Sequence, residues 1–427
     1  RVLRAAADAL RDAGERIAWA ITAEEGKTIG EARGEVDRAA ATLHYQAGRI
    51  LQPEGATYAA GVSGAEVRTV REPLGAVAVI TPWNFPTATP LWKIAPALAH
   101  GNAVVWKPAE QTPTAAVATV EALTAGGLPP GVLNLLVGDA RTGAALVDHP
   151  GVAAISFTGS TSTGQRVIAA AAPRRVPVQA EMGGHNPAIV FDDADLDSAA
   201  DHLVAGAMLS TGQKCTATRR IAVARSVYDA VVERLVRRIE ALIVGDGAEA
   251  GVDLGPLVSA EALADVMSAV DEAREAGFAV LAGGRRLDDD RLDGGHYVAP
   301  TLLAATPGLA ASPESPRAPR VWAEEVFGPV AVIAAVEDDD HAFAVANATS
   351  YGLSAAVHTS SLARTRQAIS RLNAGMICVN GPTTGAELHA PFGGVGRSSA
   401  PGPREQGDAA REFYTRTKTV TVHDPGT

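Results

Sequence analysis

Two side chains in this sequence are suited to forming an acyl-enzyme and then hydrolysing it. Cys215 ends the run GQKC, and Glu181 begins the run EMGG, 34 positions earlier. A thiolate is a strong nucleophile, and a carboxylate whose pKa lies near neutrality can activate water as a general base. Together the two groups could carry a carbonyl substrate through a thioester to an acid.

The neighbours of Cys215 decide between a nucleophile and a core residue. A free cysteine, taken alone, is more often a small buried hydrophobe. Residues 195–210 predict an amphipathic helix with Asp195 as its N-cap, and this helix ends at the glycine of GQKC. Cys215 then lies on a turn, where Lys214 and other polar neighbours favour a partly exposed thiol that can ionise. Cys378 lies in an apolar strand-like run, and we predict it as core.

Two motifs directly follow predicted buried strands, at the edge where open α/β sheets bind ligands. In TPWNFP (81–86), the amide of Asn84 beside the backbone N–H of a nucleophile could form an oxyanion hole, although an ordinary turn asparagine fits the spacing equally well. In KPAE (107–110), Lys107 and Glu110 could hold a ribose or could simply form a solvated pair.

Two more motifs suit a nucleotide. FTGSTSTG (157–164) runs from a strand into a helix, whose first N–H groups suit a pyrophosphate; a glycine-rich helix cap without a ligand is the alternative. The run is neither a GxGxxG fingerprint nor a Walker loop. In EEVFGP (324–329), Glu325 and Phe327 would share one face of a strand, and the alternative is a half-exposed strand edge.

The elements that must position these groups alternate between strand and helix from Gly75 onward, which indicates parallel sheets covered on both faces. One series breaks off near residue 184, and a second has strands at 188–191, 221–224, 278–281 and 331–335. The predicted fold class is α/β, with two doubly wound α/β domains plus a small β oligomerisation segment. The first domain takes residues 1–54 and 74–184, the oligomerisation strands take 55–73 and 415–427, and the second domain takes 185–414.

Composition limits the class of protein. A chain of 427 residues exceeds the roughly 250 to 300 that one hydrophobic core supports, so two or more domains are expected. The net charge of −11 is spread along the sequence, which argues against nucleic acid or a membrane surface as a partner. Two cysteines fit a reducing compartment, and we predict a cytoplasmic protein. The sequence begins at Arg1 within a helical pattern, so we expect that residues before it are absent.

Together these motifs resemble the aldehyde dehydrogenase superfamily over essentially the whole chain. TPWNFP, KPAE, FTGS, EMGG, GQKC, EEVFGP and PFGG (391–394) occur in the family's order and at its spacings. The resemblance implies an NAD-binding first domain and a catalytic second domain, with no metal. It implies that Cys215 is the nucleophile, Glu181 the general base, Asn84 an oxyanion donor and Glu405 a second acid that relays protons. The implied cofactor contacts are Thr81, Trp83, Lys107, Glu110, Gly159, Ser160, Gly183, Glu325 and Phe327.

The resemblance also implies the reaction. The Cys215 thiolate adds to an aldehyde, hydride passes to the nicotinamide, and Glu181 then activates water to hydrolyse the thioester. Members of the family that transfer the acyl group to coenzyme A typically lack this glutamate, so hydrolysis is favoured. Glu110 resembles the acid that accepts both ribose hydroxyls in NAD-preferring members and would repel the 2′-phosphate of NADP. We therefore predict NAD, with NADP as the alternative.

The substrate that the resemblance implies is a small-molecule aldehyde. Residues 380–394 and the run CTATRR (215–220) look most like those of members that oxidise 2,5-dioxopentanoate to 2-oxoglutarate, and Thr383 and Thr384 suit an aldehyde that carries a carboxylate. The alternatives are a broad-specificity or succinate semialdehyde dehydrogenase and, in another class, a catalytically idle structural relative. Family likeness and the strand at 418–423 predict a homodimer or homotetramer.

Two segments depart from the family pattern. His185 stands where a lysine is common, and residues 396–399 (GRSS) replace the usual lysine and glycine that follow PFGG. We expect neither segment to bear the chemistry, so an active enzyme is predicted.

Overall fold

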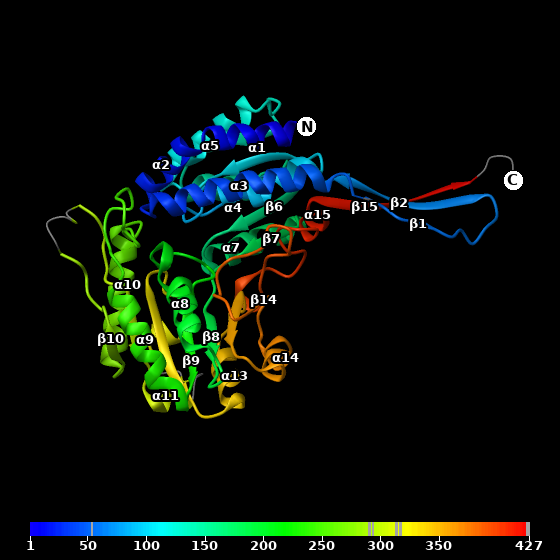
Figure 1. Ribbon diagram of the computed structural model, residues 1–427. Helices are drawn as coiled ribbons and strands as arrows, with labels where there is room; N and C mark the ends of the chain where they lie inside the picture. Colours follow the sequence, from blue (N-terminus) through cyan, green and yellow to red (C-terminus); the bar gives the residue numbers. More distant parts are fainter. Residues whose placement is uncertain (53, 289–291, 293, 312–314, 316–317, 424–427) are drawn as a thin grey trace.

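A computed structural model of the chain has two layered α/β bodies and a narrow β arm that extends away from them (Figure 1). It describes residues 1–427 except 53, 289–291, 293, 312–314, 316, 317 and 424–427. Within the described residues, the strands form sheets of five, seven and three strands. Residues 424–427, the end of the predicted oligomerisation strand, lie outside the described residues.

The first body is a parallel sheet with the strand order β5-β4-β3-β6-β7. Its strands are β3 (Ala76–Ile80), β4 (Ala103–Lys107), β5 (Leu133–Leu135), β6 (Ala154–Thr158) and β7 (Val178–Glu181). Its helices are α1 (Val2–Asp12), α2 (Gly14–Glu25), α3 (Ile29–Arg49), α4 (Ala88–Ala99), α5 (Pro113–Ala125), α6 (Ala140–Asp148) and α7 (Thr161–Ala171). Alternate residues of β3 face opposite ways, so Val77 and Val79 join a core with α1 to α5, and Ala78 joins one with α6 and α7.

The second body is a sheet with the order β10-β11-β12-β9-β8-β13-β14, parallel except where β10 runs antiparallel to β11. Its strands are β8 (Asn186–Val190), β9 (Thr218–Ala224), β10 (Ala279–Ala282), β11 (Thr301–Ala304), β12 (Val330–Val336), β13 (Ser354–His358) and β14 (Met376–Val379). Its helices are α8 (Leu196–Ala207), α9 (Tyr228–Glu240), α10 (Ala260–Glu275), α11 (Pro307–Ala311), α12 (Arg320–Ala323), α13 (Asp339–Asn347) and α14 (Leu362–Arg371). Val332 and Ile333 of β12 face separate cores, so this sheet too is covered on both faces.

The segment that returns from the second body packs on the first. Helix α15 (Ala409–Tyr414) lies within the predicted second domain, but its Ala410, Phe413 and Tyr414 join the core that α1 to α5 form with the first sheet. We therefore propose to count residues 409–414 with the first body. Every helix in the described ranges is too short or too polar to cross a lipid bilayer.

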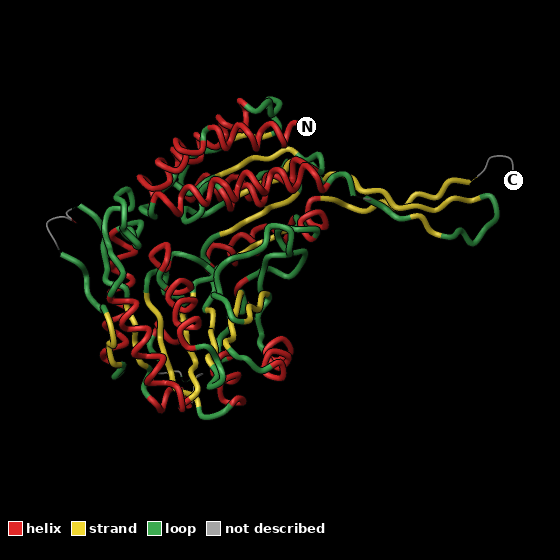
Figure 2. The backbone as a smooth tube through the Cα atoms, viewed as in Figure 1, coloured by secondary structure: helices red, strands yellow, loops and turns green. Residues whose placement is uncertain are grey.

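The arm consists of β1 (Thr57–Tyr58), β2 (Ala65–Pro73) and β15 (Thr415–His423), in the order β1-β2-β15. Figure 2 shows its strands running clear of both bodies. A three-stranded sheet without a covering layer is marginally stable, and an open strand edge is a template for pairing with another chain. Tyr58, Val62 and Val422 are 53%, 63% and 48% exposed there, so the arm presents both an edge and apolar side chains. We propose that a second copy of the chain covers it.

The substitution Val422→Asp tests this assembly. A charge on the arm would have to be buried against the partner, so we expect the particle mass measured by light scattering to fall toward that of one chain. Leu362→Asp is the matched control, because Leu362 is an apolar residue that is 63% exposed on the second body, away from the arm. An unchanged mass for Val422→Asp would show that the arm does not hold the copies together.

Candidate active site

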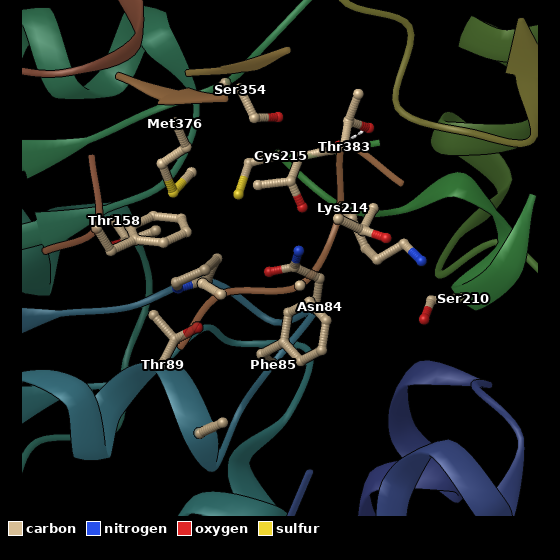
Figure 3. Close-up of a pocket in the computed structure, with 18 of the residues that line it drawn as sticks. Asn84, Phe85, Thr89, Thr158, Ser210, Lys214, Cys215, Ser354, Met376 and Thr383 are labelled. Carbon is tan, nitrogen blue, oxygen red and sulfur yellow. Dashed lines mark hydrogen bonds between the residues drawn. The ribbon is translucent and has the colours of Figure 1, made fainter. Parts of the chain in front are cut away.

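A cavity of about 1100 Å³ lies between the two bodies, at the carboxyl ends of their parallel strands. Residues predicted for catalysis and for cofactor binding line it together, and they are Trp83, Asn84, Gly159, Ser160, Gly183, Cys215, Glu325, Phe327 and Glu405. Four other predicted residues lie outside its lining, and they are Thr81, Lys107, Glu110 and Glu181. Figure 3 shows Cys215 and Asn84 pointing into this space from opposite bodies.

The loop that carries the thiol is held in an unusual backbone conformation. Helix α8 begins at the predicted cap, where Asp195 accepts the N–H groups of the first turn, but it ends at Ala207, before the predicted residue 210. A short 3-10 turn follows, in which Ser210 and Thr211 have φ of 54° and 53°, a region that costs non-glycine residues free energy.

A glutamate from the first body stabilises this turn. Glu31 Oε1 accepts hydrogen bonds from the N–H and the hydroxyl of Ser210, each at 2.8 Å. The other carboxylate oxygen closes a capping box with Thr28 at the start of α3. Sequence reasoning missed Glu31, although the TxxE spacing of a capping box was a visible signal.

The loop that carries the amide is fixed by a buried ion pair. Asn84 Nδ2 donates to the carbonyl of Gln213 at 2.8 Å, which ties the amide to the loop of the thiol. The backbone carbonyl of Asn84 accepts from Lys27 Nζ at 2.7 Å, and Lys27 is paired with Glu35 at 2.8 Å. Glu35 also accepts two backbone N–H groups at the start of α4. Sequence reasoning missed Lys27 and Glu35, because an ammonium and a carboxylate eight residues apart look like ordinary surface charges.

Electrostatics around Cys215 oppose ionisation, which corrects the prediction of a readily ionised thiol. Burial, and then the charges of Glu325, Glu181 and Glu405, raise the pKa of the Cys215 thiol to about 12. The Lys214 ammonium gives little help, because Figure 3 shows it pointing toward Ser210 and away from the sulfur. The isolated site therefore holds Cys215 as a neutral thiol.

Two buried carboxylates stand behind the thiol. Glu181 Oε2 accepts a hydrogen bond from the hydroxyl of Ser399 at 2.6 Å. Glu405 is paired with Lys93 through one oxygen, and its other oxygen is buried with no hydrogen-bond partner among the described residues. Burial raises the pKa of both carboxyl groups, and the charge of Glu405 raises the pKa of Glu181 further. A carboxyl with a raised pKa can accept a proton near neutral pH.

The cavity lining also includes residues predicted to contact a dinucleotide. Ser160 lines the cavity and caps α7, where its hydroxyl accepts the N–H of Thr163, and a helix N-terminus favours an anion such as a pyrophosphate. Gly159 and Gly183 have no room for a side chain, because a Cβ there would lie 2.6 Å from the Phe157 ring and 1.8 Å from a Glu325 oxygen. The Trp83 and Phe327 rings meet edge to face at 5.6 Å, and both residues line the cavity.

The residues outside the lining stand at the ends of the neighbouring strands. Lys107 ends β4, and burial lowers the pKa of its ammonium while the charge of Glu110 opposes that shift. Glu110 is exposed. Thr81 follows β3 and is buried, and its hydroxyl accepts a hydrogen bond from the Trp106 ring at 2.9 Å, which is a structural contact.

Two predictions about local structure are wrong. Glu325 and Phe327 lie in the loop between α12 and β12, not on a strand, because the strand begins only at Val330. In that loop Glu325 accepts the N–H of Gly184 at 3.1 Å, and burial raises its pKa to about 7. Cys378 lies on β14 as predicted, but it is partly exposed and lines the cavity, so it is not core.

Among the described residues no cluster of three or more His, Cys, Asp or Glu could hold a metal.

A cysteine, an amide and buried carboxylates therefore lie around one cavity, together with residues predicted to contact a dinucleotide. The sequence model of the aldehyde dehydrogenase family matches residues 1–420, and the chain belongs to this family. This membership confirms the resemblance and, with the two doubly wound sheets, the predicted fold class.

Named relatives are similar over nearly the whole chain. The alpha-ketoglutaric semialdehyde dehydrogenase of Bacillus subtilis (strain 168) is 40% identical over 417 residues, which are 97% of this chain and 83% of that protein. The alpha-ketoglutarate semialdehyde dehydrogenase of Haloferax volcanii is 41% identical over 421 residues, 98% of this chain and 85% of that protein. The crystal structure of betaine aldehyde dehydrogenase from Staphylococcus aureus in complex with NAD+ superposes with a TM-score of 0.93 at 32% identity, covering 99% of this chain and 81% of that one.

The substitution Glu325→Gln tests the electrostatic account of Cys215. The Glu325 carboxylate is the largest charge that opposes the thiolate, so its removal should lower the pKa of the thiol. The measurement is the pH dependence of iodoacetamide alkylation of the cofactor-free protein, with Cys378→Ala in both backgrounds to leave one thiol. We expect the alkylation profile to move to lower pH. A profile at the same or a higher pH would show that the charge of Glu325 does not contribute to the raised pKa of Cys215.

Proposed function

We propose that this aldehyde dehydrogenase uses NAD to oxidise 2-oxoglutarate semialdehyde (2,5-dioxopentanoate) to 2-oxoglutarate by hydrolysis of a thioester on Cys215. The observation that carries the proposal is the shared cavity, in which Cys215 and Asn84 face Trp83, Gly159 and Phe327. Two relatives that cover 97% and 98% of the chain, and are named for this substrate, support the choice of aldehyde.

In the first half of the reaction, Cys215 gives its proton to Glu181, a nearby carboxylate with a raised pKa, and its sulfur bonds to the aldehyde carbon. The carbonyl oxygen takes the electron pair and is stabilised by the Asn84 amide and the N–H of Cys215. NAD+, when bound, supplies the acceptor for the hydride that leaves this carbon. Ser160, Lys107, Glu110, Glu325, Trp83 and Phe327 are the residues that we expect to hold the cofactor.

In the second half, Glu181 removes a proton from water whose oxygen attacks the thioester carbon. The bond between carbon and sulfur breaks, the acid leaves, and Cys215 recovers the proton. Glu405 and Lys93 lie next to Glu181, so they offer a route by which its proton can reach solvent. The presence of Glu181 supports hydrolysis rather than transfer of the acyl group to coenzyme A.

Cations at the substrate end support an aldehyde that carries a carboxylate. Arg38 and Lys214 line the cavity, and Arg38 also donates to the carbonyl of Ala386. Thr383 is less available than expected, because its hydroxyl donates to the carbonyl of Thr216 at 2.7 Å. A carboxylate on succinate semialdehyde would meet the same cations, so that aldehyde is the second candidate substrate.

A substrate panel tests the reaction and the aldehyde. The absorbance of NADH reports the rate on 2,5-dioxopentanoate, succinate semialdehyde and hexanal, with Cys215→Ala as the inactive control. We expect kcat/KM to be highest for 2,5-dioxopentanoate and lowest for hexanal, and Cys215→Ala to lose at least about a hundredfold. A preference for hexanal would contradict the proposal that Arg38 and Lys214 bind a carboxylate of the substrate. NAD binding without turnover of any aldehyde would favour an idle structural relative.

The substitution Glu110→Ser tests the cofactor choice. Loss of this exposed carboxylate removes the charge that would repel a 2′-phosphate, so the kcat/KM ratio of NAD to NADP should fall by about tenfold or more. Glu121→Ser is a matched control, since Glu121 is an exposed acid of the same body on α5. An unchanged ratio for Glu110→Ser would assign the preference to other residues.

A further inference from the structure

The segment that departs from the family pattern lies directly against the general base. Residues 398–400 run antiparallel to the end of β7, where Met182 donates to the carbonyl of Ser398 at 2.7 Å and Ala400 donates to that of Ala180 at 2.8 Å. Ser399 and Glu181 form a β-bridge between these two donors. Both residues are buried: Ser399 is 5% exposed and Glu181 is 3% exposed.

The hydroxyl of Ser399 has a fixed orientation. Its oxygen accepts the backbone N–H of Gly394 at 2.6 Å, and an N–H group can only donate. The hydroxyl hydrogen is then free to point at Glu181 Oε2, which lies 2.6 Å away. A hydrogen bond of this length to a carboxylate is charge-assisted and is among the stronger ones in proteins.

The carboxylate of Glu181 is confined on its other side as well. A Cβ on Gly393 would lie 2.7 Å from Glu181 Oε1, so a side chain there would press on the carboxylate. The bond from Ser399 is the hydrogen bond that the described residues give to this carboxylate. The hydrogen bond from Ser399 therefore fixes the orientation of the Glu181 carboxylate.

Charges from the neighbouring elements act on Glu181 in both directions. Burial and the Glu405 carboxylate raise the pKa of Glu181, and the hydroxyl of Ser399, the Lys93 ammonium and the Arg404 guanidinium lower it. Cys215 lies close enough for Glu181 to raise the pKa of its thiol. Loss of the Ser399 hydroxyl would remove one of the groups that lower the pKa of Glu181, so this pKa would rise.

We propose that Ser399 is a positioning residue for thioester hydrolysis, because its hydroxyl holds the Glu181 carboxylate in the orientation and ionisation state that a general base requires. The proposal rests on the proposed function of Glu181. It differs from the expectation that residues 396–399 bear no part of the chemistry. Ser399 acts through Glu181 and contacts no substrate.

The test compares Ser399→Ala with Ser399→Thr and Ser398→Ala, in the full chain with NAD and the best aldehyde of the panel. Ser398 is the matched control because it is also buried and its hydroxyl accepts a backbone N–H, that of Gly352 at 3.1 Å, whereas the hydrogen bond to Glu181 comes from Ser399. Stopped-flow NADH absorbance gives the burst from the first turnover, and the steady state gives the rate of hydrolysis.

The sign follows from the lost hydrogen bond. Without it the pKa of Glu181 rises, so the base form is lost at a higher pH as the solution is acidified. For Ser399→Ala we expect the acid limb of the steady-state rate to move up by about one pH unit, which is about tenfold in rate below the limb, with the burst retained. Ser399→Thr should restore the limb, because threonine can donate the same bond, and Ser398→Ala should leave it in place.

Each outcome decides between the proposals. A wild-type protein without a burst and without turnover contradicts the proposed function itself. A normal wild-type protein with an unmoved acid limb in Ser399→Ala overturns the role of Ser399 alone. Equal slowing of Ser399→Ala and Ser398→Ala at every pH also overturns it, because that is the result of a structural defect. If Ser399→Ala does not fold, Ser399→Cys keeps the shape with a weaker donor, and a limb that does not move upward overturns the proposal.

Discussion

The geometry of the site depends on two carboxylates that stand one helical turn apart on α3. Glu31 and Glu35 are four residues apart, so they share one face of the helix. Glu31 holds the strained turn before Cys215, and Glu35 pairs with Lys27, whose ammonium holds the loop of Asn84. One rigid helix therefore sets the spacing between the nucleophile and the amide.

The Lys27–Glu35 pair is also a point at which a single substitution would destabilise the structure. Both side chains are about 1% exposed, and removal of one partner from such a pair leaves an uncompensated buried charge that costs about 3–5 kcal/mol. The hydrogen bonds of the pair explain why buried charges stand there. Glu35 accepts two backbone N–H groups and Lys27 donates to one backbone carbonyl, and two apolar side chains would leave these three backbone groups unpaired. The pair positions a loop as well as stabilising a core.

Much of the fold and many chemical groups of the site could be predicted from the sequence, because both depend on short runs of neighbouring residues. Apolar runs interrupted by helices predicted the two doubly wound sheets. A motif at a strand end predicted Asn84, and a motif after a helix predicted Cys215. The strands β11 and β13 were missed because they are short or rich in alanine, which has little strand propensity. Lys27, Glu31, Glu35 and Ser399 were missed because their roles come from contacts between segments far apart in the chain.

The ionisation of Cys215 shows why residue types near a thiol are a poor guide to its pKa. The adjacent Lys214 favoured a thiolate in the sequence, yet its ammonium points away from the sulfur, and the charges that reach the sulfur come from Glu181, Glu325 and Glu405. Burial and the three carboxylates together raise the pKa of the Cys215 thiol, so the sulfur is held in its neutral form. If the cofactor contacts Glu325 as we propose, its binding would change the largest charge that opposes the thiolate. Occupancy of the cofactor site would then be coupled to the pKa of the nucleophile.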